Sequence, residues 1–272
     1  MSSTVLTRIE DGVATLTLNR PLAMNAFDGD TARAIIEAVE AFGADPAVRV
    51  MVVSGEGKSF SAGGDFNWVL TWPGLDAITR RVGADAVMGA VQAVYDFPKP
   101  SIARVHGAAV GGGIGLMLAC DFAIAARSAQ LGSATLRMGW QPDEGGHWLL
   151  VEHLGVKRAL EFLLRKEIVP AEEAARLGLV NEVVDDEKLM PHALGLAAEL
   201  AKGPQVAMRL LKRATYNAAA LSFDQAGDDI AAKTAISDFH TDAREGAPAF
   251  FERRPAVFNK WLAGEDETAE HP

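Results

Sequence analysis

The 272-residue chain carries 26 lysine and arginine residues against 36 aspartate and glutamate residues, and 49% of its residues are hydrophobic. This composition predicts a globular protein with a substantial core and excludes a disordered or fibrous chain. The formal charge of −10 argues against binding to nucleic acid, because a phosphate backbone must be met by an excess of basic side chains.

Predicted strands and helices alternate through the first half of the chain. In order, the pattern predicts strands at 5–9 and 13–18, a helix at 32–42, a strand at 48–53, a helix at 75–96, a strand at 101–105, a helix ending at 119 and a strand at 122–126. The first two strands flank Asp11-Gly12, a tight-turn pair, and so predict a hairpin. The continuous apolar run at 48–53 favours a sheet covered on both faces.

Helices dominate the second half. Only 179–184 is predicted as a further strand, and helices are expected at 207–219 and 222–239. We therefore predict a core over residues 1–200 that holds the site and a helical oligomerisation region over 201–263. The polar residues 264–272 predict a disordered tail.

Three glycine-rich loops are the features that suggest chemistry. They are Ser61-Ala62-Gly63-Gly64-Asp65, Gly111-Gly112-Gly113-Ile114-Gly115 and Pro142-Asp143-Glu144-Gly145-Gly146. Glycine lets a backbone approach a ligand closely. The second loop leads into an apolar helix, so its free N–H groups are candidates to hold a ligand oxygen, although close packing of helix on sheet is the simpler role for such a run.

Other classes of site fit the sequence poorly. The six histidines show no ligand spacing with cysteine or acidic residues, so no metal site is predicted. Gly113-Ile114-Gly115 begins like a dinucleotide fingerprint, but Leu118 stands where its third glycine belongs and no suitably placed acid follows. A dinucleotide oxidoreductase is therefore disfavoured.

The compartment follows from cysteine usage and apolar runs. Cys120 is the single cysteine, so disulfide scaffolding is excluded. The first residues lack the pattern of a cleavable signal, and the longest apolar stretch, 114–126, contains Asp121 and is too short to span a bilayer. We expect a cytoplasmic protein without a membrane partner.

The three loops, in this order and separated by strand–helix units, resemble the enoyl-CoA hydratase/isomerase (crotonase) superfamily over almost the whole chain. The matching segments are 18–27, 60–65, 119–122, 174–180 and 245–254. The resemblance implies an α/β fold, a crotonase-like spiral of ββα units with a helical C-terminal trimerisation region. It also implies a homotrimer or dimer of trimers that acts on an acyl-CoA thioester, with coenzyme A entering as part of the substrate and no permanently bound cofactor.

The same resemblance assigns the binding residues. It implies that the amides of Gly64 and Gly112 form an oxyanion hole for the thioester carbonyl. The residues implied to bind coenzyme A are Leu22, Ala23, Met24, Ala62, Gly63, Gly64, Gly112, Phe250 and Arg253. Of these, Phe250 and Arg253 would close the nucleotide pocket, from a neighbouring subunit if not from the same chain. Packing remains the alternative role for Gly63 and Gly113, and a solvated helix face for Arg253.

Carboxylates decide which reaction the resemblance implies. Hydratases of the family place two glutamates where this chain has Gly115 and Thr135, and neither residue can act as a base. Asp143 stands where isomerases of phenylacetate degradation and dienoyl-CoA isomerases carry a catalytic aspartate, with Glu144 as second candidate. One carboxylate suffices to move a proton between two carbons, although Asp143 could instead cap the helix that follows.

We therefore predict an acyl-CoA isomerase that shifts a double bond through an enolate or dienolate, in fatty acid metabolism or aromatic acid degradation. A hydratase or other lyase that uses Asp143 or Glu144 is the first alternative, and a non-catalytic CoA-thioester-binding protein is the second. Trp68, Trp72 and Trp140 flank the loops, and they line the acyl pocket or pack in the core. In the pocket, they would favour a bulky or aromatic acyl group.

Overall fold

The computed structural model describes residues 3–71, 74, 76–133, 135–141, 146–165 and 168–263. The strands are β1 (Val5–Glu10), β2 (Val13–Leu18), β3 (Val50–Gly55), β4 (Ser101–Val105), β5 (Ala108–Val110), β6 (Phe122–Ala126), β7 (Gln130–Gly132), β8 (Ile168–Pro170) and β9 (Glu182–Val184). The α-helices are α1 (Gly29–Ala44), α2 (Phe66–Val69), α3 (Ala77–Tyr95), α4 (Gly112–Leu118), α5 (Gly146–Arg165), α6 (Ala171–Leu177), α7 (Leu189–Lys202), α8 (Gln205–Ala218), α9 (Phe223–Phe239) and α10 (Thr241–Glu252). Short 3₁₀ turns are η1 (Pro21–Ala23), η3 (Thr135–Met138), η4 (Asp186–Lys188) and η5 (Lys260–Ala263).

The main sheet has six strands in the order β1-β2-β3-β4-β6-β9. Only the first pair is antiparallel, and the other four pairs are parallel. The predicted hairpin is confirmed, with Asp11 and Gly12 both at positive φ in its turn. The parallel strands place the loops that follow β3 and β4 at one edge of the sheet, because the carboxyl ends of parallel strands lie together.

A second sheet, in the order β5-β7-β8, was not predicted from the sequence. Each of its strands has three residues, which is too short for an alternation of apolar and polar side chains to be recognised. The pairing joins segments far apart in the chain, with Ala109 opposite Leu131 and Leu131 opposite Val169. This small sheet fixes β5, the strand that leads directly into the second glycine-rich loop.

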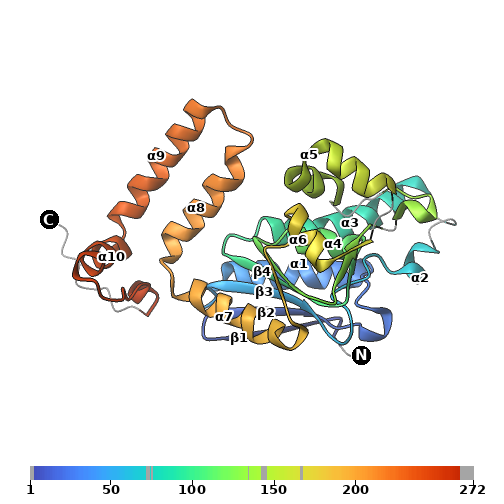
Figure 1. The fold of residues 1–272 in the computed structure, drawn as a ribbon, viewed down its shortest axis with the longest axis horizontal. Coiled ribbons are helices and arrows are strands. Elements are labelled where there is room, and N and C mark those ends of the chain that lie inside the picture. Colours follow the sequence, from blue (N-terminus) through green and yellow to red (C-terminus); the bar gives the residue numbers. More distant parts are fainter. Residues whose placement is uncertain are drawn as a thin grey trace.

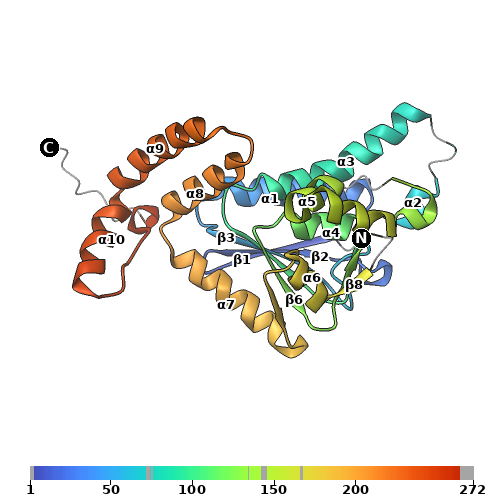
Figure 2. The same cartoon turned by 45° about the horizontal axis from the view of Figure 1, so that its top comes forward.

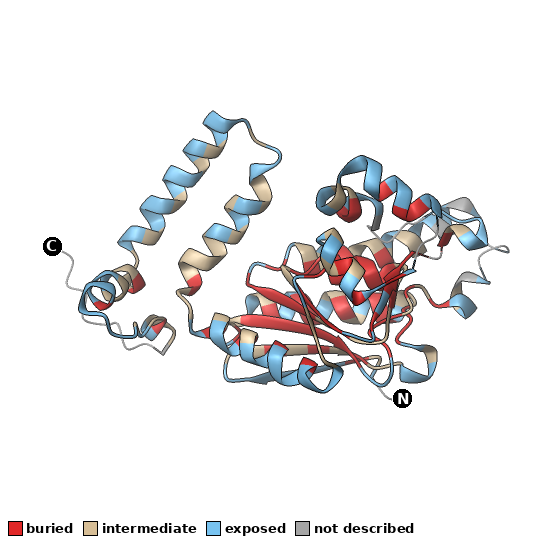
Figure 3. Cartoon of the chain, in the orientation of Figure 1, coloured by how far each residue is buried: buried red, intermediate tan, exposed pale blue. Residues whose placement is uncertain are grey.

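Both faces of the main sheet are covered, as the apolar run in β3 predicted. Met51 and Val53 belong to the large core that α1, α3 and α4 cover, whereas Val50 and Val52 pack in a separate cluster beneath α7. Figure 3 shows the buried residues concentrated in the strands and in α4. No helix among the described residues is long and apolar enough to cross a membrane.

The C-terminal helices α8, α9 and α10 extend away from the sheet, as Figures 1 and 2 show. The predicted helices at 207–219 and 222–239 are confirmed to within two residues at each end, and the Ser222 side chain accepts a hydrogen bond from Gln225 N to begin α9. Most residues of α9 are exposed (Figure 3). The helices therefore make few of the contacts that hold the core together.

A largely buried ion pair joins α8 to the core. The Asp121 carboxylate accepts hydrogen bonds from Ser101 N, from Lys212 Nζ and from Tyr216 Oη, each at 2.8 Å. Burial, together with the Asp121 carboxylate, raises the pKa of Tyr216, so its hydroxyl remains the donor at neutral pH. Lys212 and Tyr216 lie one helical turn apart on α8 and thus fix its second half against the starts of β4 and β6.

We expect Lys212→Met to lower the free energy of unfolding by about 3 kcal/mol, because it leaves the largely buried Asp121 carboxylate without its cation. Lys188→Met is the matched control, since Lys188 pairs with Asp185 at the surface and should contribute less than about 1 kcal/mol. Chemical denaturation followed by circular dichroism compares the two variants. Equal losses would contradict a special role for the Asp121 pair.

Candidate active site

The first and second glycine-rich loops lie in direct backbone contact. A Cβ atom on Gly63 would lie 2.7 Å from Gly112 N, and one on Gly113 would lie 2.4 Å from Ser61 O. Gly63 and Gly111 also have positive φ angles, which disfavour any side chain. Glycine is therefore required at Gly63 and Gly113 for the two segments to approach this closely. The predicted packing role of Gly63 is real, and it is what brings the two loops together.

Two backbone N–H groups remain available at this contact. Gly112 is the first residue of α4, so its N–H has no acceptor within the helix. In the first loop, Phe27 N donates to Gly63 O and Asp65 N donates to Phe27 O, a pattern that leaves out Gly64 N. Among the described residues, neither the Gly64 nor the Gly112 N–H donates to a protein acceptor. Such a pair can hold a carbonyl oxygen that becomes negative.

A polar network holds the first loop in place. Asn25, buried and at positive φ, donates from Nδ2 to Ser59 O at 2.7 Å, and its Oδ1 accepts from Arg20 N at 2.9 Å. The Ser61 hydroxyl donates to Asn25 O at 2.9 Å and accepts from Gly63 N. These bonds fix the backbone that leads into Gly64 before any ligand binds, which preorganises the donor.

Asp65, the acid of the first loop, is fully occupied. Its Oδ2 accepts from Arg20 Nη2 at 2.6 Å, and its Oδ1 accepts from the N–H groups of Asn67 and Trp68 at the start of α2. Both oxygens of this carboxylate are engaged by protein donors, so it is not positioned to accept a proton from a substrate. Its role is to connect the first loop to α2.

The segment expected to hold coenzyme A lies beside this loop. Ala62 N donates to Met24 O at 2.9 Å, which places residues 22–24 directly against the predicted contact Ala62. The side chains of Leu22 and Met24 are exposed, and Ala23 is half-buried. Exposed apolar side chains next to a preformed pair of donors suit contact with a ligand.

Other reactive side chains near the loops are not suited to catalysis. Burial raises the pKa of the Cys120 thiol, whose Sγ donates to Leu116 O, so it stays protonated. His106 lies behind the first loop, with Nε2 bonded to Gly57 O, and burial followed by the nearby Arg104 lowers its pKa. The described residues contain no group of three or more acids, histidines and cysteines that could hold a metal ion.

Gly115 and Thr135, the positions at which the resemblance implies glutamates in hydratases, are both buried, and neither side chain is acidic. Gly115 lies in α4, one turn after Gly112, and Thr135 opens η3. Neither residue supplies a base. Asp143 and Glu144, the predicted bases, lie outside the described residues, and so does Trp72. Their assignment stays a prediction from the sequence.

The other two tryptophans predicted near the acyl group, Trp68 and Trp140, differ in their surroundings. Trp68 is half-buried and packs against the core, close to the start of α1, where a Cβ on Gly29 would lie 3.5 Å from its ring. Trp140 is more exposed, and its ring faces that of Phe66. Core packing thus accounts for the described contacts of Trp68, whereas Trp140 presents a ring to solvent.

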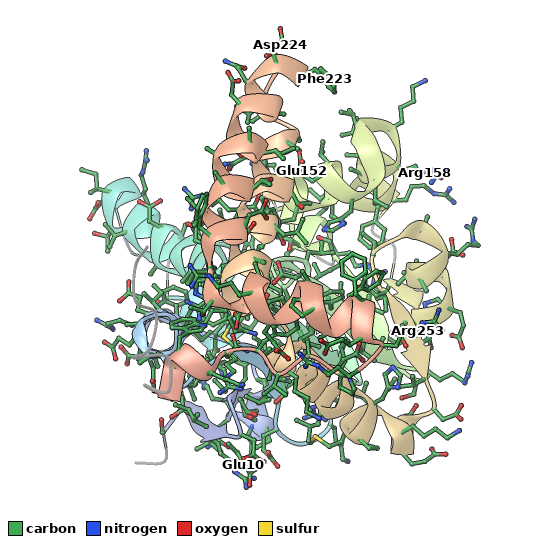
Figure 4. The ribbon with its side chains drawn as sticks, turned by 90° about the vertical axis from the view of Figure 1, so that its left-hand side faces the viewer. Glu10, Glu152, Arg158, Phe223, Asp224 and Arg253 are labelled. Atoms are coloured by element: carbon green, nitrogen blue, oxygen red, sulfur yellow. The ribbon has the colours of Figure 1, made fainter. Side chains whose placement is uncertain are left out.

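The predicted nucleotide contacts Phe250 and Arg253 are not brought to the loops within one chain. Both are exposed at the end of α10, where Figure 4 labels Arg253. Figures 1 and 2 place α10 at the opposite end of the molecule from α2, which directly follows the first loop. If these residues bind the nucleotide, they do so from a neighbouring subunit.

The structure adds residues that the sequence did not single out. Arg20 and Asn25 belong to a matching segment, but no role followed from their position, and Phe66 carried no signal of its own. The only sign in the sequence of a role for Arg20 and Asn25 was that both are polar residues in a mostly apolar segment between a predicted strand and a predicted helix. Their structural role depends on hydrogen bonds to residues about 35 to 45 positions away, from Asn25 to Ser59 and from Arg20 to Asp65.

Comparison with known proteins agrees with this arrangement. The family model for enoyl-CoA hydratase/isomerase matches residues 8–261. Crotonyl-CoA hydratase of Syntrophomonas wolfei is 37% identical over 92% of this chain and 95% of its own, and 1,2-epoxyphenylacetyl-CoA isomerase of Escherichia coli is 34% identical over 95% and 99%. The solved structure of an enoyl-CoA hydratase from Polaromonas sp. JS666 superposes with a TM-score of 0.90 at 29% identity, covering 94% of this chain and 99% of that one. The predicted fold class is confirmed.

Proposed function

Since the chain belongs to the enoyl-CoA hydratase/isomerase family, we propose that it is an acyl-CoA thioester isomerase that moves a double bond by proton transfer. The observation that carries the proposal is the pair of free N–H groups at Gly64 and Gly112, together with the absence of an acid at the buried positions Gly115 and Thr135. The pair supports enolate chemistry, and the missing acids disfavour a two-glutamate hydration.

The mechanism requires one base and a stabilised anion. The thioester oxygen accepts hydrogen bonds from Gly64 N and Gly112 N, which makes the neighbouring carbon acidic. Asp143 removes a proton from one carbon, the negative charge spreads to the thioester oxygen as a dienolate, and Asp143 returns the proton to another carbon. Each donor of this kind contributes about 3 to 4 kcal/mol to the transition state, and a positioned base contributes a factor of about 10² to 10⁴.

Deuterated water distinguishes the possible activities. With a panel of enoyl-CoA thioesters, we expect products that are isomers of the substrate, with deuterium incorporated to the extent that the protonated Asp143 exchanges with solvent before it returns the proton; mass spectrometry detects both. A product that has gained the elements of water identifies a hydratase, the second candidate, which the 37% identity to a crotonyl-CoA hydratase favours. Binding without any change in the thioester would identify a non-catalytic protein and would overturn the proposal.

We further propose an oligomer with three-fold symmetry. An apolar groove runs between α8 and α9, lined by residues that include Leu210, Leu211, Ala214 and Ile230. Phe250 and Phe251 of α10 are also exposed. Large apolar surfaces of this kind need a covering partner, and a neighbouring α10 would bring Phe250 and Arg253 to the coenzyme A segment.

Light scattering at micromolar concentration tests the assembly. We expect a mass of three or six chains, because the groove and the exposed phenylalanines are covered only in an assembly. A stable monomer would contradict the assembly and would also remove Phe250 and Arg253 from the binding site.

A further inference from the structure

Two aromatic rings stand exposed beside the candidate oxyanion pair. Phe66 is 51% exposed and Trp140 is 38% exposed, although both are large apolar side chains next to a well-packed core. Their ring centroids lie 5.9 Å apart, with an angle of 35° between the ring planes. We call these two residues the aromatic pair. It forms one continuous apolar surface built from two segments more than 70 residues apart in the sequence.

The position of Phe66 is tied to that of the donor Gly64. Two residues separate them, so their Cα atoms lie within about 7 Å of each other. The residue between them, Asp65, is bonded to Arg20 Nη2 at 2.6 Å and caps α2, the helix that begins with Phe66. The network that holds the oxyanion donor therefore also holds the ring.

The backbone at Trp140 is fixed by hydrogen bonds of its own turn. The backbone N–H of Trp140 donates to Thr135 O at 3.3 Å, and Gly139 N donates to Leu136 O at 3.1 Å. The residues after η3 therefore form a closed turn on the buried Thr135. Figures 1 and 2 show α2 and the N-terminal end of α5, the helix that follows this turn, at the same end of the molecule. Leu70, one turn after Phe66, is a further exposed apolar side chain of this segment.

We propose that the aromatic pair recognises an aromatic ring in the acyl group of the substrate. This proposal rests on the proposed function, because it assumes that the thioester oxygen is bound at Gly64 and Gly112. With the thioester oxygen at those donors, the short separation of Gly64 and Phe66 would bring an acyl group within reach of the aromatic pair. A flat ring gains ring-to-ring contacts there that a saturated group of the same size lacks, and such contacts contribute about 2- to 12-fold in affinity beyond the buried area.

The test compares two thioesters that differ only in the saturation of one ring, phenylacetyl-CoA and cyclohexylacetyl-CoA. Calorimetric titration of the wild-type protein should show that phenylacetyl-CoA binds at least about 5-fold more tightly than cyclohexylacetyl-CoA. Phe66→Leu and Trp140→Leu keep an apolar side chain but remove the aromatic face, so each should reduce this preference and the double variant should bring it below about 2-fold. Circular dichroism confirms that the variants fold.

Phe223→Leu is the matched control, because Phe223 is 93% exposed at the tip of the α8–α9 hairpin (Figure 4), and Figures 1 and 2 show this tip away from α2. It should keep the wild-type preference. Equal binding of the two thioesters by the wild-type protein would overturn the aromatic assignment while leaving the proposed function intact. A preference that survives in the folded double variant would also overturn it. If neither thioester nor any enoyl-CoA binds, both proposals fail.

Discussion

Asp143→Asn should lower the rate of double-bond migration at least about 100-fold and leave the affinity for CoA thioesters nearly unchanged. The substitution removes the basic oxygen but keeps the shape of the side chain, so the loss reports on proton transfer alone. Asparagine caps a helix about as well as aspartate. A purely structural role at the start of α5 therefore predicts turnover close to that of the wild type.

Glu144→Gln is the control for Asp143→Asn, because the two acids are adjacent and only one is needed. Both variants are assayed with the same enoyl-CoA thioester, and binding is measured separately by calorimetry. A loss in Glu144→Gln with an active Asp143→Asn would identify Glu144 as the base. If both single variants stay active, the mechanism with one carboxylate has no base and must be abandoned.

Gly112→Pro should reduce turnover by a factor of about 10² to 10³, the range observed when one oxyanion donor is removed. Proline deletes the N–H that makes no bond within the described part of the protein. Because Gly112 is the first residue of α4, the fixed φ angle of proline is compatible with the helix. The expected result is a folded protein that has lost stabilisation of the enolate.

Phe223→Pro is the control for Gly112→Pro, since it places proline at the first position of α9, an exposed helix end. It should leave turnover unchanged. Circular dichroism establishes that both variants are folded before their rates are compared. Wild-type turnover in a folded Gly112→Pro protein would remove this amide from the mechanism.

The sequence by itself was sufficient to predict the elements that are encoded by short, local patterns of residues. The alternation around Asp11-Gly12 predicted the hairpin, and the apolar run at 48–53 predicted a strand buried on both faces. Ordered glycine-rich loops also indicated the family. In each case, neighbouring residues carry the whole signal, because turn geometry, capping and periodicity are properties of a short segment.

The site depended on contacts that no short segment encodes. The close approach of Gly63 to Gly112 N, the bond from Arg20 to Asp65 and the meeting of Phe66 with Trp140 each join residues about 45 to 75 positions apart. The strands β5, β7 and β8 are three residues long; they pair with one another and, through Ala109, with Ser61 of the first loop. Likewise, the distance of Phe250 and Arg253 from the loops follows from the direction in which α8 and α9 leave the core (Figure 1). Packing of the whole chain sets that direction, so only the tertiary structure decided which predicted residues meet within one chain.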